Sequence, residues 1–378
     1  MYKFKDIIEE VKEFNTDLKY GLDDIVGVTI EKGLIPTIAN LTQTALDKFY
    51  IIKPGTFVYN PRTHGVRLGM GYNNTCNTYI TSWNNIAFKV KDTAHSIVTP
   101  KYLWLFFCKP IWDRLTNFLA WGSSTIVFAW KDFLDIEIDL PPIEKQREIV
   151  SEYETLTRRI RLNEQMIEKL EATAQALYRH TFVDNIDKQN LPQGWQIAVL
   201  TDIATFLNGV ACQKYEGDSL PVLKIRELSQ GKIDEKSDTV GNDIPQEYVI
   251  KDGDLIFSWS ATLFIRIWTG GECVLNQHLF KVTPKGCPKW FVQIHIEKHI
   301  EDWNRLISAK ATSMGHIKRE DLENAKVVIP NIDTMRKMDE QMSPIFHAKY
   351  LKQQEKIKLT ELQSLLLAKM GRKKTIII

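Results

Sequence analysis

The sequence predicts a mixed α/β protein made of two repeated halves, in which a long helix follows each globular part. Three observations predict this class. The second half of the chain repeats the first, short apolar runs follow turn signals in both halves, and each half ends in a helical pattern of apolar residues. At 378 residues the chain is long enough for two or three domains, each with a sizeable core.

The repeat is clearest before the two helical segments. DFLDIEIDLPPIEKQREIV, residues 132–150, matches DLENAKVVIPNIDTMRKMD, residues 321–339, at an offset of 189 (321 minus 132), so that Pro141 falls on Pro330. With small gaps the match extends upstream, and the duplication therefore covers nearly the whole chain. The upstream pairs are Asp6-Ile7 with Asp202-Ile203, YIIKPGTFVYN from Tyr50 with YVIKDGDLIFS from Tyr248, and IAFKV from Ile86 with HLFKV from His278.

The globular parts show signals of both strands and helices. Thr56–Tyr59 and Leu255–Phe257 follow P-G and D-G turn signals and are rich in β-branched and aromatic residues, which is typical of strands. Helical spacing of apolar residues alternates with such runs. It is clearest at Phe4, Ile7, Ile8, Val11 and Phe14.

A heptad pattern begins after Pro141-Pro142. No Gly or Pro interrupts residues 143–181, which predicts a helix about 58 Å long at about 1.5 Å per residue. Asn163 in this seam either sets the register as a polar core residue or faces solvent, and we favour the register role. Apolar residues and Asn163 recur at alternating intervals of four and three at Ile149, Tyr153, Leu156, Ile160, Asn163, Ile167, Leu170, Ala174 and Leu177.

The second helical segment, residues 332–370, is less regular. Lys349, Lys352 and Lys356 stand where the transferred register expects apolar residues, so the sequence leaves this register open. Pro344 is expected to kink or break the helix near its first third, because proline lacks the N–H and its ring clashes with the preceding turn. The apolar positions include Met338, Met342, Ile345, Leu359, Leu362 and Leu366.

The order of these parts constrains the architecture. If the first helix carries the chain from one domain to the next, the second must return, so antiparallel pairing and a pseudo-two-fold repeat are expected. Two such domains suit unlike half-sites on one face of DNA, which recur about every 34 to 36 Å. The boundaries predicted are 1–140 for the first domain, 141–184 for the first helical spacer, 185–330 for the second domain, and 331–378 for the second spacer and a basic tail.

Composition is that of an ordinary globular protein. The formal net charge of +2 neither requires nor excludes a nucleic acid, because phosphate binding needs only a local basic face. The five cysteines form no C-x-x-C pair, so no metal or redox site is expected and a reducing, prokaryotic cytoplasm fits best. No run approaches the roughly 20 apolar residues of a membrane span, and no signal peptide is expected.

Three segments resemble the conserved regions of specificity subunits of type I restriction-modification systems, in both wording and order. They are LPPIEKQREIV at 140–150, EKLEATAQALYRHTF at 168–182 and LPQGWQIAVLTDIATFLNG at 191–209. The resemblance spans almost the full length. It implies a non-catalytic subunit whose two target-recognition domains each bind one component of a bipartite, asymmetric double-stranded DNA target.

The resemblance also implies partners. The helical regions and nearby conserved segments would dock two methyltransferase subunits that modify adenine, and restriction subunits with ATP-driven translocation would join them. S-adenosylmethionine, ATP and Mg would be bound by these partners and none by this chain.

Polar, basic and aromatic loop residues are the candidates for DNA contact, because such side chains hydrogen-bond base edges and phosphates. A solvated loop or a plain turn is the alternative for each, and Trp259 and Trp268 could be core residues. Candidates in the first half are Asn60, Arg62, His64, Arg67, Tyr72, Asn73, Asn74, Ser123 and Ser124. Those in the second are Lys224, Arg226, Ser258, Trp259, Ser260, Thr262, Arg266, Lys310, Thr312, Ser313 and Lys318.

An enzyme, a coiled-coil scaffold and a DNA-binding protein without restriction partners are the alternatives. A methyltransferase would need a D-P-P-Y or N-P-P-Y motif, but Asn60-Pro61 is followed by Arg62-Thr63, which offers no aromatic ring to hold a flipped base. The sequence also lacks G-x-x-x-x-G-K-[ST], H-E-x-x-H and G-x-S-x-G. A scaffold would not need two large, divergent domains.

Overall fold

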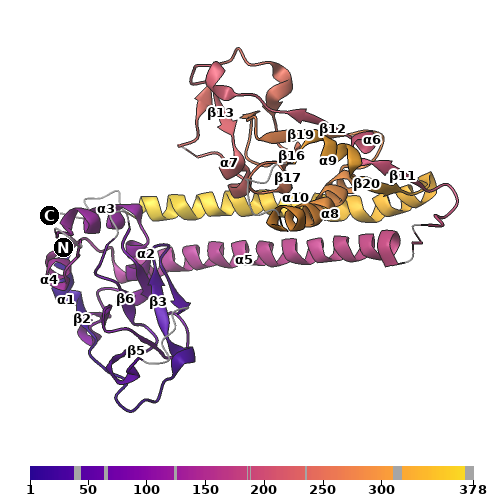
Figure 1. Cartoon of the computed structure of the whole chain (residues 1–378). Coiled ribbons are helices and arrows are strands. Elements are labelled where there is room, and N and C mark those ends of the chain that lie inside the picture. The colour runs from indigo at the N-terminus through magenta and orange to yellow at the C-terminus, as the bar shows by residue number, and fades with distance from the viewer. Residues whose placement is uncertain are drawn as a thin grey trace. The chain divides into compact units, whose positions relative to one another are not determined.

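The chain divides into two compact units in the computed structural model (Figure 1), which describes residues 1–37, 44–63, 67–122, 126–184, 186–187, 189–234, 236–309 and 317–370. Unit 1 comprises Met1–Arg158 and Thr360–Ile378, and unit 2 comprises Arg159–Leu359. Both units mix helices and strands, as predicted.

Unit 1 is built on a four-stranded antiparallel sheet in the order β2-β9-β6-β7, formed by Ile8–Glu10, Ile86–Val90, Phe57–Tyr59 and Met70–Tyr72. Its inner face carries aromatic residues that pack on the helices. The rings of Phe57 and Phe88 stack at 5.0 Å, for example. The other elements are α1 (Phe4–Ile7), α2 (Pro100–Phe107), α3 (Pro110–Leu119) and α4 (Trp130–Asp135), with the strand pairs β1–β10 (Tyr2–Lys3, Glu137–Ile138), β3–β4 (Val26–Thr29, Gly33–Pro36) and β5–β8 (Tyr50–Ile52, Tyr79–Thr81).

Unit 2 contains a sheet of the same order, β12-β19-β16-β17, formed by Ala204–Asn208, Leu279–Pro284, Leu255–Ser258 and Phe264–Ile267. A second sheet has the order β14-β13-β18-β15, and its β15–β18 pair corresponds to β5–β8 of unit 1. It consists of Thr239–Val240, Leu220–Leu223, Cys273–Leu275 and Val249–Ile250. The remaining elements are α6 (Leu200–Ile203), α7 (Ile225–Gln230), α8 (Lys289–Ala309), α9 (Arg319–Asn324) and the strand pair β11–β20 (Gln196–Val199, Lys326–Ile329).

The shared topology confirms the tandem repeat, and strand register corrects one part of its alignment. Ile8 lies opposite Val90 in unit 1, and Ala204 lies opposite Pro284 in unit 2. The structural counterpart of IAFKV at 86–90 is therefore FKVTP at 280–284, not HLFKV at 278–282. A shift of two residues keeps every side chain on the same face of a strand, so the apolar pattern cannot distinguish the two alignments.

Both predicted long helices are present as α5 (Ile143–Arg179) and α10 (Ile332–Lys369). Within unit 2 they run antiparallel, because rising numbers on α5 meet falling numbers on α10. Glu164 lies 2.9 Å from the Lys356 ammonium, and Glu171 lies 3.2 Å from that of Lys349. These ion pairs explain two of the three lysines at positions where apolar residues were expected, and Lys352 pairs with Glu355 of its own helix at 2.9 Å.

Every position of the predicted α5 seam is buried or half-buried. Asn163 is 5% exposed and Ala174 is 4% exposed. Ile149 and Tyr153 pack against the core of unit 1, and Leu177 packs against that of unit 2. Leu156, Ile160, Ile167 and Leu170 are half-buried. The seam thus follows the less exposed face of the helix.

Of the kink or break predicted at Pro344, the break is wrong, because α10 continues through this residue. Met342, fully buried, and Phe346, 9% exposed, anchor the helix in the core of unit 2 on both sides of the proline. This packing offsets the roughly 3 kcal/mol that an interior proline costs a helix. Within the described ranges, no helix combines the length and apolarity needed to cross a membrane.

Candidate nucleic-acid interface

In unit 1, Arg62 lies at an exposed edge with a tryptophan that sequence reasoning missed. Arg62 and Trp121 each form a β-bridge with Val127, and both side chains are exposed, Trp121 by 67%. The Asn60 side chain accepts a hydrogen bond from the Arg62 backbone at 3.0 Å and so shapes this turn. Arg67 is also exposed. A guanidinium beside an exposed indole can contact a phosphate and a sugar or base face.

The next three candidates of unit 1 differ in their surroundings. Tyr72 is half-buried and stacks on Phe57 at 4.6 Å. Asn73 is 1% exposed, and its amide donates to the carbonyls of Ile52 at 3.0 Å and Asn77 at 2.8 Å. Asn73 therefore holds a turn, whereas Asn74 is exposed and accessible to a ligand.

In unit 2 the serines of the corresponding loop are buried. Ser258 is fully buried and its hydroxyl donates to the Thr262 carbonyl at 2.7 Å, while Ser260 is 4% exposed. Thr262 is exposed and Trp259 is half-buried. Ser258 and Ser260 thus shape the loop that presents Trp259 and Thr262.

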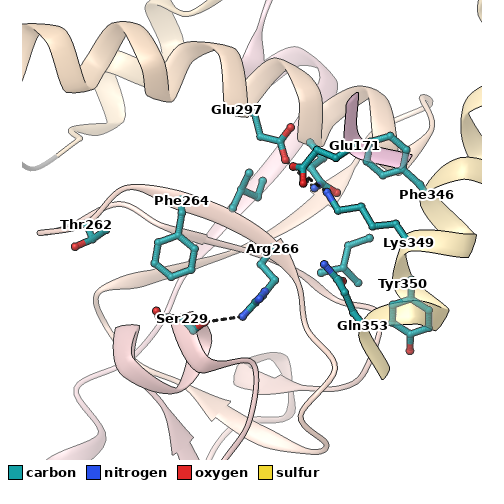
Figure 2. Close-up of a pocket in the computed structure, with 13 residues that line it drawn as sticks. Glu171, Ser229, Thr262, Phe264, Arg266, Glu297, Phe346, Lys349, Tyr350 and Gln353 are labelled. Atoms are coloured by element: carbon teal, nitrogen blue, oxygen red, sulfur yellow. Dashed lines mark hydrogen bonds and ion pairs between the residues drawn. The ribbon is translucent and has the colours of Figure 1, made fainter. Parts of the chain in front are cut away.

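Arg266 lines a cavity of about 430 Å³, and Figure 2 shows its side chain pointing to Ser229 at the carboxyl end of α7. Its guanidinium donates to the carbonyls of Leu228 and Ser229, both at 2.8 Å, and burial lowers the pKa of the guanidinium. Gly231 ends α7 with a φ of 75°, and a Cβ there would lie 2.9 Å from Arg266 Nη1. Arg266 therefore stabilises the end of this helix.

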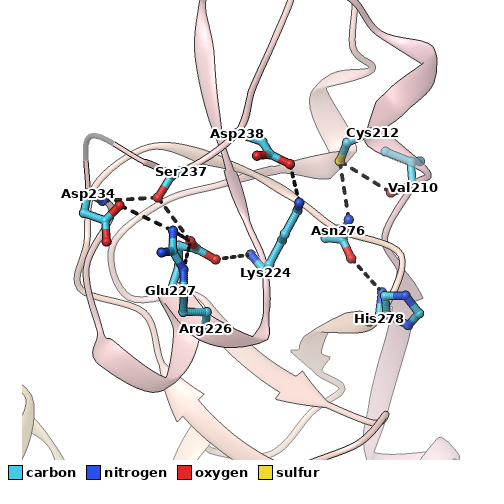
Figure 3. Close-up of polar contacts among 10 residues, drawn as sticks. All are labelled: Val210, Cys212, Lys224, Arg226, Glu227, Asp234, Ser237, Asp238, Asn276 and His278. Atoms are coloured by element: carbon cyan, nitrogen blue, oxygen red, sulfur yellow. Dashed lines mark hydrogen bonds and ion pairs between the residues drawn. The ribbon is translucent and has the colours of Figure 1, made fainter. Parts of the chain in front are cut away.

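Lys224 and Arg226 belong to the polar cluster drawn in Figure 3. Arg226 lies 2.6 Å from the buried Glu227 carboxylate and 3.3 Å from that of Asp234, and these carboxylates raise its pKa. Lys224 pairs with Asp238 and lowers the pKa of that carboxyl. Both cations already have carboxylate partners, so a DNA phosphate would have to compete with these carboxylates for them.

Six candidates lie outside the described residues: His64, Ser123, Ser124, Lys310, Thr312 and Ser313. Lys318 is exposed at the start of α9. It lies beside Trp259 along a groove of about 940 Å³, whose other walls include Phe206, Phe280 and Arg319. Sequence reasoning missed Phe206, Phe280 and Arg319, because they come from separate elements and carry no motif that links them.

Two sheets of one topology and register, with different residues on their exposed edges, define a duplicated protein with two unlike surfaces. The family model described as "Type I restriction modification DNA specificity domain" matches residues 2–172 and again residues 192–361. The chain belongs to this family, and its role is DNA recognition in a type I restriction-modification system.

Known relatives agree with this membership. The type I restriction enzyme MjaIX specificity subunit of Methanocaldococcus jannaschii is 22% identical over 302 residues, which cover 72% of this chain and 68% of that protein. The crystal structure of the type I restriction-modification S subunit from M. genitalium matches with a TM-score of 0.58 at 12% identity. That match covers 97% of this chain and 94% of the other, and it shows a shared fold.

Proposed function

We propose that this chain binds a bipartite, asymmetric DNA target, with one component read by each unit. The observation that carries the proposal is that both units share one sheet topology but have different residues at the edges of their sheets. The backbone N–H of Phe128 donates to the carbonyl of Pro61 at 2.8 Å, and that of Ile317 donates to Trp259 at 3.0 Å. Proline and tryptophan at one framework position cannot make the same contacts, so the two components should differ.

The chain performs no chemistry of its own in this proposal. Many polar side chains near the proposed interface, such as those of Asn73 and Arg266, donate hydrogen bonds to backbone carbonyls. None of these contacts places a nucleophilic side chain beside a general base. S-adenosylmethionine, ATP and Mg would accordingly be bound by partner subunits. Those partners would comprise two adenine methyltransferase subunits and restriction subunits that translocate DNA.

Matched apolar residues support two equivalent partner sites. Met1 precedes the first strand of unit 1 and is 57% exposed, and its counterpart Ile197 in unit 2 is 53% exposed. Two copies of one partner need the same surface twice, and a duplicated chain can provide it.

The test is to reconstitute the chain with its methyltransferase subunits and to map methylated adenines genome-wide, with and without this chain. The recovered motif then supplies duplexes in which one component at a time is scrambled. At one fixed salt concentration, scrambling either component should weaken binding by at least tenfold. Equal affinity for intact and scrambled duplexes would identify a scaffold and refute the proposal.

A further inference from the structure

Unit 2 has an aromatic groove, and at the positions of its three aromatic residues the described part of unit 1 has Glu10, Pro61 and Ile86. Its floor is formed by Phe206, Trp259 and Phe280, and Lys285, Lys318 and Arg319 line its rim. The Trp259 and Phe280 rings lie 5.6 Å apart at 33°, and Phe206 meets Phe280 edge-on at 6.0 Å. Trp259 Nε1 donates to Asn208 Oδ1 at 3.1 Å, which fixes the orientation of the indole.

The groove is positively charged. Its lining contains three cationic side chains and no carboxylate among the described residues. Lys285 Nζ donates to the Thr201 carbonyl at 2.8 Å, a contact that unit 1 repeats between Lys91 and the Lys5 carbonyl at 2.6 Å. Lys285 therefore has a framework role, and the cations particular to unit 2 are those of Lys318 and Arg319.

Backbone hydrogen bonds identify the counterparts of these two cations in unit 1. The N–H of Asp132 donates to the Ala129 carbonyl at 3.1 Å, as that of Asp321 donates to the Lys318 carbonyl at 3.0 Å. Ala129 therefore stands in the place of Lys318, and the next residue, Trp130, stands in the place of Arg319.

Trp130 packs into the aromatic core of unit 1. Its ring lies 5.5 Å from that of Phe88 and 5.4 Å from that of Phe133. An apolar side chain in unit 1 thus takes the position where unit 2 places an exposed guanidinium. Arg319 approaches one carboxylate, that of Glu323, at 3.3 Å, and both partners are more than half exposed. Such an ion pair is weak in water and leaves the guanidinium accessible.

We propose that this groove binds the sugar-phosphate backbone of the DNA component read by unit 2, an inference that rests on the proposed function. Lys318 and Arg319 would each contact a phosphate, and the aromatic floor would cover the apolar face of a deoxyribose. A docked methyltransferase is the competing occupant. Two identical partners require features common to both units, however, whereas this groove is particular to one, as an asymmetric target requires.

The test variant combines Lys318→Ala with Arg319→Trp, which gives unit 2 the residues that unit 1 already accommodates. In the reconstituted complex, log K should depend less steeply on log salt, by about 2, or about 1 for each lost phosphate contact. Ethylation of single phosphates should interfere with wild-type binding in both DNA components. In the variant, this interference should disappear from one component only.

The matched control removes two positive charges outside the groove, by Lys251→Ala with Arg305→Ala. Both side chains are exposed and ion-paired, with Glu272 and Asp302 respectively. This control should keep the wild-type interference pattern. Trp259→Leu tests the floor separately and should weaken binding with the salt slope unchanged. Thermal melting of each variant establishes that it is folded.

The outcomes separate the two proposals. Wild-type interference at one component only would refute the two-part target itself. A folded Lys318→Ala, Arg319→Trp variant with wild-type salt slope and interference would overturn the groove inference alone. Unchanged DNA binding with loss of methyltransferase association would also overturn it, because the groove would then be a protein-docking site.

Discussion

Gln146 of α5 and Met335 of α10 occupy the same position in the two repeats but attach their helices in different ways. The Gln146 side chain is fully buried, accepts a hydrogen bond from the Thr99 backbone at 3.0 Å, and donates to the carbonyls of Ile97 at 2.7 Å and Pro141 at 2.9 Å. Met335 packs on the core of unit 2 through apolar contact. One scaffold position thus uses polar attachment in one unit and apolar attachment in the other.

Gln146→Met should destabilise unit 1, although methionine serves at the equivalent position. The substitution leaves three part-buried backbone groups without their partner, and we expect a loss of about 3 kcal/mol in the free energy of unfolding. Scanning calorimetry should show a lower Tm, by about 2 to 4 °C per kcal/mol.

The control for this substitution is Gln196→Met, which makes the same chemical change at an exposed position on β11. Its Tm should stay within a degree or so of wild type, since surface changes usually cost less than about 0.5 kcal/mol. If Gln146→Met has the same Tm as Gln196→Met, the three hydrogen bonds of the Gln146 side chain contribute nothing to the free energy of unfolding.

Arg266→Ala should reduce stability more than DNA affinity. Its guanidinium satisfies two carbonyls at the end of α7, and losing both bonds should cost about 2 kcal/mol. Urea unfolding should show a lower midpoint, and Arg266→Lys should restore part of it, because an ammonium also donates to carbonyls but lacks the shape and reach of the guanidinium. Phosphate interference by the folded variant should match wild type. A normal midpoint with one DNA component lost would instead show that Arg266 reads DNA.

Periodicity predicts correctly where it recurs over many residues, whereas the helical spacing from Phe4 to Phe14 covers only the short α1 and is followed by strand β2. The tandem repeat, the mixed α/β class and both long helices follow from spacing that recurs over many residues. Pro344 shows where this reasoning stops, because the continuity of α10 depends on Met342 and Phe346 fitting a core built from distant strands.

The candidate site is harder to predict from the sequence than the fold. The side chains that hydrogen-bond DNA are of the same types as those that hydrogen-bond the chain's own backbone. Asn73 and Arg266 are residue types that contact bases, yet here their donors face carbonyls of their own chain. Phe206 and Phe280 resemble the core aromatic residues in the sequence, and only the fold places them beside Lys318. Polar loops can be located from sequence, but the direction in which their side chains point cannot.

His295 should make stability depend on pH. It is 4% exposed, lies 3.3 Å through Nδ1 from the Tyr178 hydroxyl, and its pKa is lowered from 6.5 to about 3 by burial and by the nearby His299 and Lys298. Between these values the unfolded chain binds a proton that the folded chain does not. The stabilisation that comes from keeping His295 neutral should therefore be fully present above about pH 6.5. The free energy of unfolding should fall as the pH is lowered towards 3.

His295→Gln removes this proton and should flatten the pH dependence. Between about pH 6.5 and 5 the wild type should lose up to about 2 kcal/mol that the variant keeps, measured from urea midpoints at each pH. Burial lowers the pKa of His299 as well, so a smaller dependence should remain. Parallel profiles for the two proteins would show that His295 is protonated equally in the folded and unfolded states.

The antiparallel helix pair in unit 2 should show charge coupling between Glu164 and Lys356. Their charged groups are 2.9 Å apart, and each side chain is about two-fifths exposed, 46% for Glu164 and 41% for Lys356. Glu164→Lys and Lys356→Glu should each destabilise the unit. The double reversal should recover about 0.5 kcal/mol relative to their sum, and high salt should reduce this coupling. If the changes in the free energy of unfolding are additive at low salt, Glu164 and Lys356 are not coupled. The ion pairs with α5 would then not be the reason for the lysines of α10.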